Sequence, residues 1–107
     1  MKIFKFGGAS IKDAASVKRV ASVLNHFPGE EILIVVSAMG KTTNALEKLV
    51  QSLITKNKDL VRSQIKELRE AHFRIVDELF SPDEHRVHND VEILFTQLEI
   101  ISQSPLP

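Results

Sequence analysis

Residues 5–10 read Lys-Phe-Gly-Gly-Ala-Ser and combine residue types that bind phosphate. Lys5 stands at the end of an expected strand, and Ser10 carries a hydroxyl group where a helix is expected to begin. Gly7 and Gly8 would let the backbone approach a ligand and direct N–H groups toward it. A lysine supplies a mobile charge suited to a phosphoryl group in transfer. The alternative is that the glycines merely turn the chain and that Lys5 is a solvated strand residue.

A second loop rich in hydroxyl groups follows another expected strand. Residues 35–44 read Val-Val-Ser-Ala-Met-Gly-Lys-Thr-Thr-Asn. The Gly-Lys-Thr step is typical of a P-loop, but that pattern requires a glycine where Val35 stands, which disfavours a P-loop here. What remains is a loop at the carboxyl end of a strand, the place where open α/β sheets bind ligands. Alternatively, Thr43 and Asn44 only cap the helix that follows.

Two strands and a helix must position these loops. Residues 2–6 alternate in polarity and predict a short strand, while the apolar run 32–36 suits a strand buried on both faces of a parallel sheet. A helix is expected over 12–26, ended by Pro28 and Gly29. Parallel strands place their carboxyl ends at the same edge of the sheet. The two loops should therefore lie side by side.

Helices are expected over the rest of the chain. The spacing predicts a second helix over about 44–56, begun by Asn44, and a third with an apolar stripe over 61–79. A fourth helix begins either with Ser81 as its cap or at Asn89. The predicted fold class is α/β, with a β-α-β start followed by about three helices.

Composition excludes several classes of function. The 107 residues contain no cysteine, which excludes a disulfide scaffold, a cysteine-ligated zinc module and a cysteine nucleophile. The formal net charge of zero argues against nucleic-acid binding through bulk positive charge. No apolar run is long enough to span a membrane and no signal peptide is visible, so a cytoplasmic setting is expected. Residues 1–50 carry a net charge of +3 and residues 51–107 of −3, which favours an anionic ligand in the first half.

The histidines and phenylalanines of the second half have simpler interpretations. His85 and His88 could share a helix face, but no third ligand stands at a diagnostic spacing, so we expect no metal site there. His72 falls on the apolar stripe of the third helix and is expected to be a partly buried structural residue. The phenylalanines at 73, 80 and 95 are expected in the core.

Taken together, the two loops resemble the opening of the aspartokinases, which are members of the amino-acid kinase family. The motif at 5–10 is similar to the Lys-Phe-Gly-Gly-Thr/Ala-Ser segment that ends their first strand. The Val-Val-Ser-Ala segment at 35–38 and the Thr-Asn pair at 43–44 match their second motif in order and separation. Other amino-acid kinases share the lysine and the glycine pair, but not both motifs. The resemblance implies part of a three-layer α/β/α fold.

The resemblance also implies a reaction and roles for single residues. Aspartokinases transfer the γ-phosphoryl group of ATP, supplied with Mg²⁺, to the side-chain carboxylate of L-aspartate. Carried over motif by motif, Lys5 would be catalytic and would stabilise the charge of the moving phosphoryl group. Phosphate and ATP binding would fall to Lys5, Gly7, Gly8 and Ser10, and aspartate binding to Ser37, Ala38, Thr43 and Asn44. No residue can be assigned to the Mg²⁺ ion.

The length suggests that part of such an enzyme is missing. We expect residues 1–107 to be the N-terminal portion of an amino-acid kinase catalytic domain, inactive by itself as a kinase. Homo-oligomers are expected, because unpaired strand edges of an incomplete sheet would favour self-association. The alternative is a free-standing helical interaction module with a β-α-β start, which would bind a partner through its long amphipathic helices.

Overall fold

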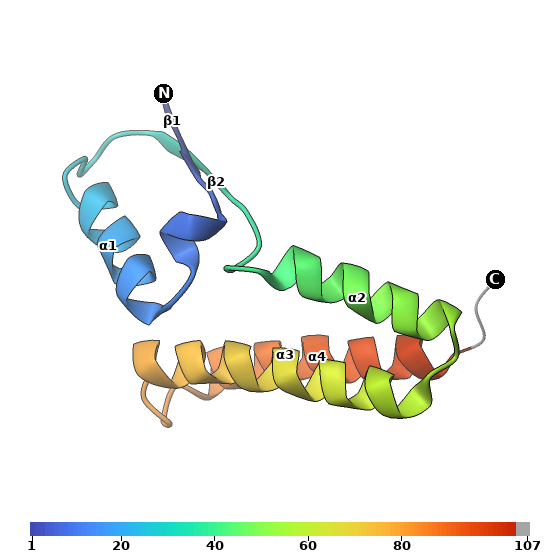
Figure 1. Cartoon of the computed structure of the whole chain (residues 1–107). Helices are drawn as coiled ribbons and strands as arrows, with labels where there is room; N and C mark the ends of the chain where they lie inside the picture. The colour runs from blue at the N-terminus through green and yellow to red at the C-terminus, as the bar shows by residue number, and fades with distance from the viewer. Residues whose placement is uncertain (105–107) are drawn as a thin grey trace. The chain divides into compact units, whose positions relative to one another are not determined.

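The computed structural model describes residues 1–104 and divides the chain into two compact units (Figure 1). The first unit covers residues 1–42 and contains the predicted β-α-β start, and the second begins at Thr43 and is helical. Each unit is described by itself below.

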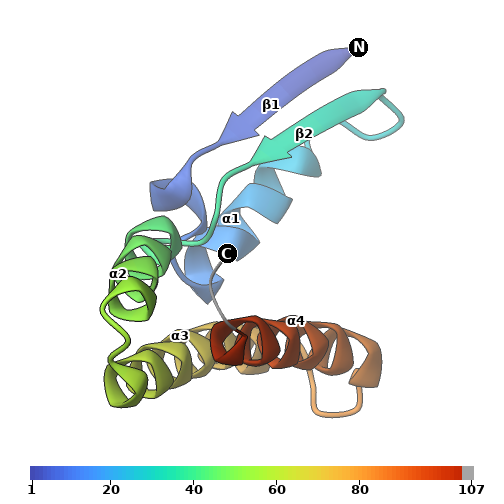
Figure 2. The ribbon, with the colours of Figure 1, turned by 90° about the vertical axis from the view of Figure 1, so that its right-hand side faces the viewer.

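The first unit is built on two parallel strands. Strand β1 covers Lys2–Phe6 and strand β2 covers Ile32–Val36, in a register that pairs Lys2 with Ile32 and Phe6 with Val36. Figure 2 shows the two strands side by side, with helix α1 (Ala14–Leu24) on one side of them. The β-α-β prediction and both strand ranges are confirmed.

Helix α1 is shorter than the sequence predicted. A 3₁₀ helix, η1 (Gly8–Ile11), precedes it, and α1 then begins after Asp13 rather than at Lys12. The Asp13 carboxylate accepts a hydrogen bond from Ser16 N at 2.8 Å, and the Asp13 N–H donates to Ser16 Oγ at 3.0 Å. This reciprocal capping box fixes the start of the helix. The prediction was wrong because the short side chain of Ser16 completes the box in place of a glutamate.

Strand β2 is more exposed than its apolar run predicted. Side-chain exposure runs from 44% at Val35 to 57% at Val36, whereas burial on both faces was expected. The physical reason is the width of the sheet: among the described residues, β1 is the one strand that pairs with β2. On the other strand, Phe4 is half-buried because its ring lies 5.1 Å from that of Phe27.

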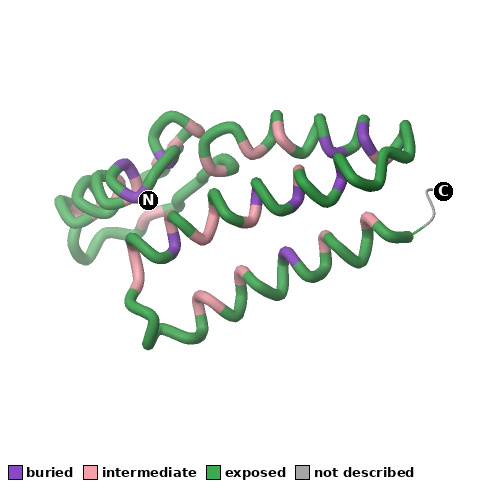
Figure 3. The backbone as a smooth tube through the Cα atoms, turned by 60° about the horizontal axis from the view of Figure 1, so that its bottom comes forward, coloured by how far each residue is buried: buried purple, intermediate pink, exposed green. Residues whose placement is uncertain are grey.

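The second unit contains helix α2 (Thr42–Ile54) except for its first residue, together with helices α3 (Lys58–Leu79) and α4 (His85–Gln103). Its core is formed by Leu49 of α2 with Val61 and Ile65 of α3. Figure 3 shows how few positions along these helices are buried. The unit is therefore a thin layer of helices with much exposed apolar surface.

Helix α2 begins two residues earlier than predicted. Thr42 donates hydrogen bonds to the Met39 carbonyl from its backbone nitrogen, at 3.0 Å, and from its hydroxyl group, at 2.6 Å. These bonds start the helix at Thr42, so Asn44 lies inside the first turn and is not the cap. The prediction failed because it took the capping-box spacing of Asn44 and Glu47 as the start signal.

Helix α2 ends in a Schellman motif with an unusual residue. Lys56 has a φ of +57°, in the left-handed region that favours glycine. The Asn57 N–H donates to the Ser52 carbonyl at 3.0 Å, and the Lys56 N–H donates to the Leu53 carbonyl at 3.2 Å. This turn separates α2 from α3, where the sequence predicted a short break.

Helix α4 begins at neither of its two predicted starts. It starts at His85, and residues 81–84 form a turn in which the Glu84 N–H donates to the Ser81 carbonyl at 3.0 Å. The carboxylate of Glu84 reaches back to the Ser81 N–H at 3.3 Å. The Ser-Pro-Asp-Glu pattern therefore forms a turn instead of the first turn of the helix, and Asn89 lies within α4.

Helices α3 and α4 are joined by polar and aromatic contacts as well as by the apolar stripe. Arg69 of α3 forms an ion pair with Glu92 of α4. The His72 ring meets Phe95 edge-on at 5.5 Å, which confirms a partly buried structural histidine. Phe95 is buried, whereas Ile101 near the end of α4 is 65% exposed. Phe73 and Phe80 are half-buried.

Candidate functional site

The two motif loops meet at Gly8. A Cβ atom added to Gly8 would lie 3.0 Å from the Gly40 carbonyl oxygen, 3.6 Å from the Ala38 carbonyl oxygen and 3.6 Å from Ser37 Oγ. A side chain at this position would force the facing backbone to move, so glycine favours this approach of backbone to backbone. The expectation that both loops lie side by side at the carboxyl ends of the strands is confirmed.

The glycines of these loops differ in what they do. A Cβ atom on Gly7 would meet nothing in the described chain within 4 Å, and Gly7 has extended backbone angles that other residues adopt. Gly40 has a φ of +52°, in the left-handed region that favours glycine. A Cβ atom added to Gly40 would lie 3.7 Å from Lys12 Cα. Gly8 and Gly40 are thus required by local structure, while Gly7 leaves open space above the loop.

Ser10 lies at a different kind of helix end than expected. It is exposed within η1, a 3₁₀ helix of four residues, and its backbone N–H donates to the Gly7 carbonyl at 3.0 Å. The first α-helical residue is Ala14. The expectation that Ser10 stands at the start of the first α-helix is therefore wrong, because η1 separates the glycine pair from α1.

Lys5 is exposed on β1 and pairs in register with Val35. The next residue on β1, Phe6, accepts a hydrogen bond from the Ser37 N–H at 3.0 Å, so strand pairing continues into the second loop. The Ser37 hydroxyl group donates to the Ala38 carbonyl at 2.9 Å. This pairing holds the start of the second loop next to the strand end that carries Lys5.

Thr43 and Asn44 belong to the second unit. Both are exposed in the first turn of α2, directly after the loop in sequence. The structure thus brings Gly8, Ser37 and Ala38 together within the first unit. The alternative that Asn44 caps α2 is wrong, since the helix begins before it.

The charge around the loops is positive. Residues 1–42 carry six Lys or Arg and three Asp or Glu. The hydrogen bond from the Ser16 N–H is the main cause that lowers the pKa of the Asp13 carboxyl group; the Ser16 side chain, Lys12 and Arg19 add smaller effects in the same direction, and partial desolvation opposes them. The Asp13 carboxylate is thus engaged in capping the start of α1. The net charge of the unit favours an anionic ligand.

Metal ligands do not cluster in the part of the chain that is described. Within residues 1–104, no group of three or more His, Cys, Asp or Glu side chains could hold a metal ion. His88 is engaged in the turn between α3 and α4: its Nδ1 is 2.9 Å from the Glu84 carbonyl oxygen and its Nε2 is 3.3 Å from Asp77 Oδ1.

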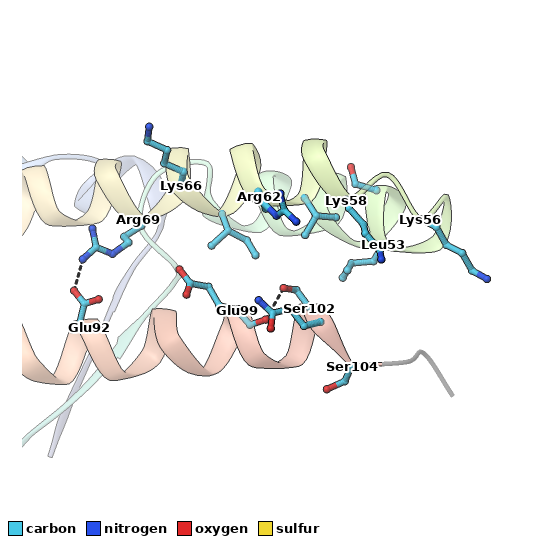
Figure 4. Close-up of a pocket in the computed structure, with 14 residues that line it drawn as sticks. Leu53, Lys56, Lys58, Arg62, Lys66, Arg69, Glu92, Glu99, Ser102 and Ser104 are labelled. Atoms are coloured by element: carbon cyan, nitrogen blue, oxygen red, sulfur yellow. Dashed lines mark hydrogen bonds and ion pairs between the residues drawn. The ribbon is translucent and has the colours of Figure 1, made fainter.

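A groove in the second unit was not foreseen from the sequence. It has a volume of about 980 Å³ and lies between α3 and the end of α4, with apolar residues such as Val61 and Ile65 in its lining (Figure 4). Basic side chains of α3 border it, facing Glu92 and Glu99 of α4. The sequence signal for this groove was the spacing of Lys58, Arg62, Lys66 and Arg69 on one helix face.

None of the helices among the described residues is long and apolar enough to cross a membrane.

Comparison with known proteins places this geometry in a family. Residues 1–96 match the model of the amino acid kinase family. Aspartokinase 1, chloroplastic, of Arabidopsis thaliana is 36% identical over 105 residues, covering 94% of this chain and 17% of the relative. Aspartokinase 2, chloroplastic, of the same plant is 40% identical over 79 residues, covering 72% of this chain and 14% of the relative.

A bacterial relative extends the match. The bifunctional aspartokinase/homoserine dehydrogenase of Buchnera aphidicola is 27% identical over 111 residues, covering 99% of this chain. The chain spans 13% to 17% of the length of these three relatives. The family match over most of the chain, together with two loops that meet as the motifs predict, shows that the chain belongs to the amino acid kinase family.

Proposed function

We propose that these residues form part of the substrate site of an aspartate kinase. The proposed reaction transfers the γ-phosphoryl group of ATP to the side-chain carboxylate of L-aspartate and gives 4-phospho-L-aspartate. The observation that carries the proposal is the meeting of the two loops at Gly8, because it puts a glycine-rich phosphate motif beside a loop with hydroxyl groups.

Each loop has a separate role in the proposal. The exposed amine of Lys5 neutralises charge on the phosphoryl group as it moves, while the backbone at Gly7 and Gly8 and the Ser10 hydroxyl group hold the phosphates. The open space above Gly7 leaves room for a phosphate to approach the backbone.

The acceptor side of the site lies in the second loop. Ser37, Ala38, Thr43 and Asn44 position aspartate, whose own carboxylate is the nucleophile. A carboxylate is ionised at neutral pH and needs no general base. Catalysis then consists of positioning and electrostatic stabilisation. ATP would arrive with Mg²⁺, and we assign no residue of this chain to the ion.

Titration of the chain with ATP by isothermal calorimetry tests the phosphate part of the proposal. We expect Lys5→Ala to weaken ATP binding by about tenfold, the loss of one charge-assisted contact worth about 1.4 kcal/mol. Lys18→Ala is the matched control, because it removes the same charge from an exposed position on α1. Equal weakening in both variants would show attraction by net charge alone and would contradict a site at Lys5.

The same preparation tests the expectation that the chain alone is inactive. We expect no formation of ADP that depends on aspartate, because the chain spans at most 17% of the three relatives described above. Turnover that requires both ATP and aspartate would overturn that part of the proposal.

A further inference from the structure

The turn that leads from the second loop into α2 is closed by two hydrogen bonds to one carbonyl group. The Met39 carbonyl accepts from the Thr42 N–H at 3.0 Å and from the Thr42 hydroxyl group at 2.6 Å. A carbonyl oxygen has two lone pairs, so both bonds can form at once. A hydroxyl group that caps a helix accepts from an N–H ahead of it, whereas the Thr42 hydroxyl group donates back to the loop. The side chain of Thr42 therefore fastens the loop that precedes α2.

The middle peptide of this turn is the part that meets the glycine-rich loop. Gly40 is the second residue of the turn, and its carbonyl oxygen would lie 3.0 Å from a Cβ atom on Gly8. Types of four-residue turn differ in the orientation of the middle peptide, although the same bond joins their first and fourth residues. The approach of the Gly40 carbonyl to Gly8 thus depends on how firmly the turn is held.

The same turn also contacts the other end of η1. Gly8 is the first residue of η1, and Lys12 is the residue that follows its last. A Cβ atom on Gly40 would lie 3.7 Å from both the α-carbon and the carbonyl oxygen of Lys12. Because neither Gly8 nor Gly40 has a side chain that could absorb a displacement, a change in the turn passes directly to the backbone of η1.

The two adjacent threonines differ in their surroundings. Thr42 is half-buried and its hydroxyl group is bonded to the loop, whereas Thr43 is exposed. The motif gives Thr43 a role in binding aspartate and gives Thr42 none. The contacts of Thr42 indicate a separate task, which is to hold the backbone of the second loop.

We infer that the Thr42 hydroxyl group positions the glycine-rich loop. By holding the turn at residues 39–42, it keeps the Gly40 carbonyl against Gly8 and so fixes the backbone at the start of η1. The consequence for ATP rests on the proposed function, in which this backbone holds the phosphates. The link from Thr42 to Gly8 does not rest on it. Thr42 is a positioning residue, whereas Lys5 acts at the phosphoryl group itself.

A double-mutant cycle tests the link without a ligand. Thr42→Val keeps nearly the same shape and the backbone bond but removes the hydroxyl bond, so the turn can yield. We expect Gly8→Ala to lose less free energy of unfolding in Thr42→Val than in wild type. Thr55→Val is the matched control, because the Thr55 hydroxyl group donates to the carbonyls of Gln51 and Ser52 at the other end of α2. Urea unfolding measures each loss, and an equal loss from Gly8→Ala in all three backgrounds would overturn the inference.

Amide shifts and ATP binding give readouts that a role in stability alone would not move. In the ¹⁵N-labelled chain, Thr42→Val should shift the Gly8 amide, and Thr42→Ser, which keeps a hydroxyl group, should leave it near its wild-type position. By calorimetry, Thr42→Val should weaken ATP binding about two- to tenfold, the range that one net hydrogen bond supports. Thr42→Ser and Thr55→Val should bind ATP as wild type does. A Gly8 amide that does not move in Thr42→Val would overturn the inference.

Failure of this inference and failure of the proposed function give different results. If the wild-type chain does not bind ATP, the phosphate part of the proposed function fails, while the double-mutant cycle and the Gly8 amide still decide whether Thr42 positions the loop. If Lys5→Ala weakens ATP binding and Thr42→Val does not, the proposed function stands and the positioning role of Thr42 is overturned.

Discussion

At the scale of single residues, the site depends on where a side chain is absent. Gly8 approaches three atoms of the second loop, whereas Gly7 approaches none within 4 Å in the described chain. The sequence presents these glycines as an equivalent pair, and the motif gives both a phosphate-binding role. The structure separates them: Gly8 joins the loops, and Gly7 leaves space for a ligand.

A pair of alanine substitutions tests this division. In Gly8→Ala the new methyl group would lie 3.0 Å from the Gly40 carbonyl oxygen, a backbone atom that cannot move without shifting the loop. We expect a loss of about 1–3 kcal/mol in the free energy of unfolding, as for other overpacked positions. Gly7→Ala should change it by less than about 0.5 kcal/mol. Urea unfolding followed by circular dichroism measures both, and equal losses would contradict the account.

At the scale of secondary-structure elements, the sequence predicted the strands better than the helix ends. The ranges 2–6 and 32–36 are correct because alternation and β-branched runs are local signals. Helix starts depend on which of several capping residues is used. Ser16 completes the box that begins α1, whereas Asn44 and Ser81 have capping patterns that begin no helix.

The end of α2 offers a test in which one substitution stabilises. Lys56 adopts the left-handed conformation that costs a residue with a side chain about 1–2 kcal/mol, partly offset by the greater flexibility of glycine in the unfolded chain. We therefore expect Lys56→Gly to raise the free energy of unfolding by about 0.5 kcal/mol.

Lys48→Gly is the control for that prediction, because it removes the same side chain from an exposed, helical position of α2. It should lower the free energy of unfolding by about 1 kcal/mol. The two variants are compared by chemical denaturation. If both substitutions destabilise the chain to the same extent, the turn at Lys56 is not a helix-terminating motif.

The turn between α3 and α4 should respond to pH. The hydrogen bond to the Glu84 carbonyl is the main cause that raises the pKa of His88, and the Asp77 carboxylate adds to it, while partial desolvation opposes both. A histidine whose pKa is raised in the folded state contributes stability below its unfolded pKa, and this contribution is lost as pH rises through the folded value. In wild type the contribution is therefore present near pH 6 and absent near pH 8.

Comparison of His88→Gln with wild type isolates that contribution. We expect the difference in stability between pH 6 and pH 8 to shrink in His88→Gln and to persist in His85→Gln, which changes a neighbouring exposed histidine of the same helix. Thermal unfolding at the two pH values measures it. An unchanged pH dependence in His88→Gln would show that the contact with Asp77 does not stabilise the fold.

At the scale of the whole molecule, the chain divides by charge and by structure at nearly the same place. The β-α-β unit carries the excess of lysine and arginine, and the helical part carries the excess of acid. The sequence predicted the motifs, their order and their meeting at one sheet edge, because parallel strands impose it. It could not predict the groove beside α3, since that depends on how α4 packs.

The groove also supplies the competing hypothesis for where an anion would bind, because Lys58 and Arg62 border it. An NMR titration of the ¹⁵N-labelled chain with Mg²⁺-ATP separates the two sites most directly. The account predicts that the largest amide shifts fall on residues 7–10 and 37–41. Shifts concentrated on residues 56–69, or no shifts at all, would contradict a phosphate site at the two loops.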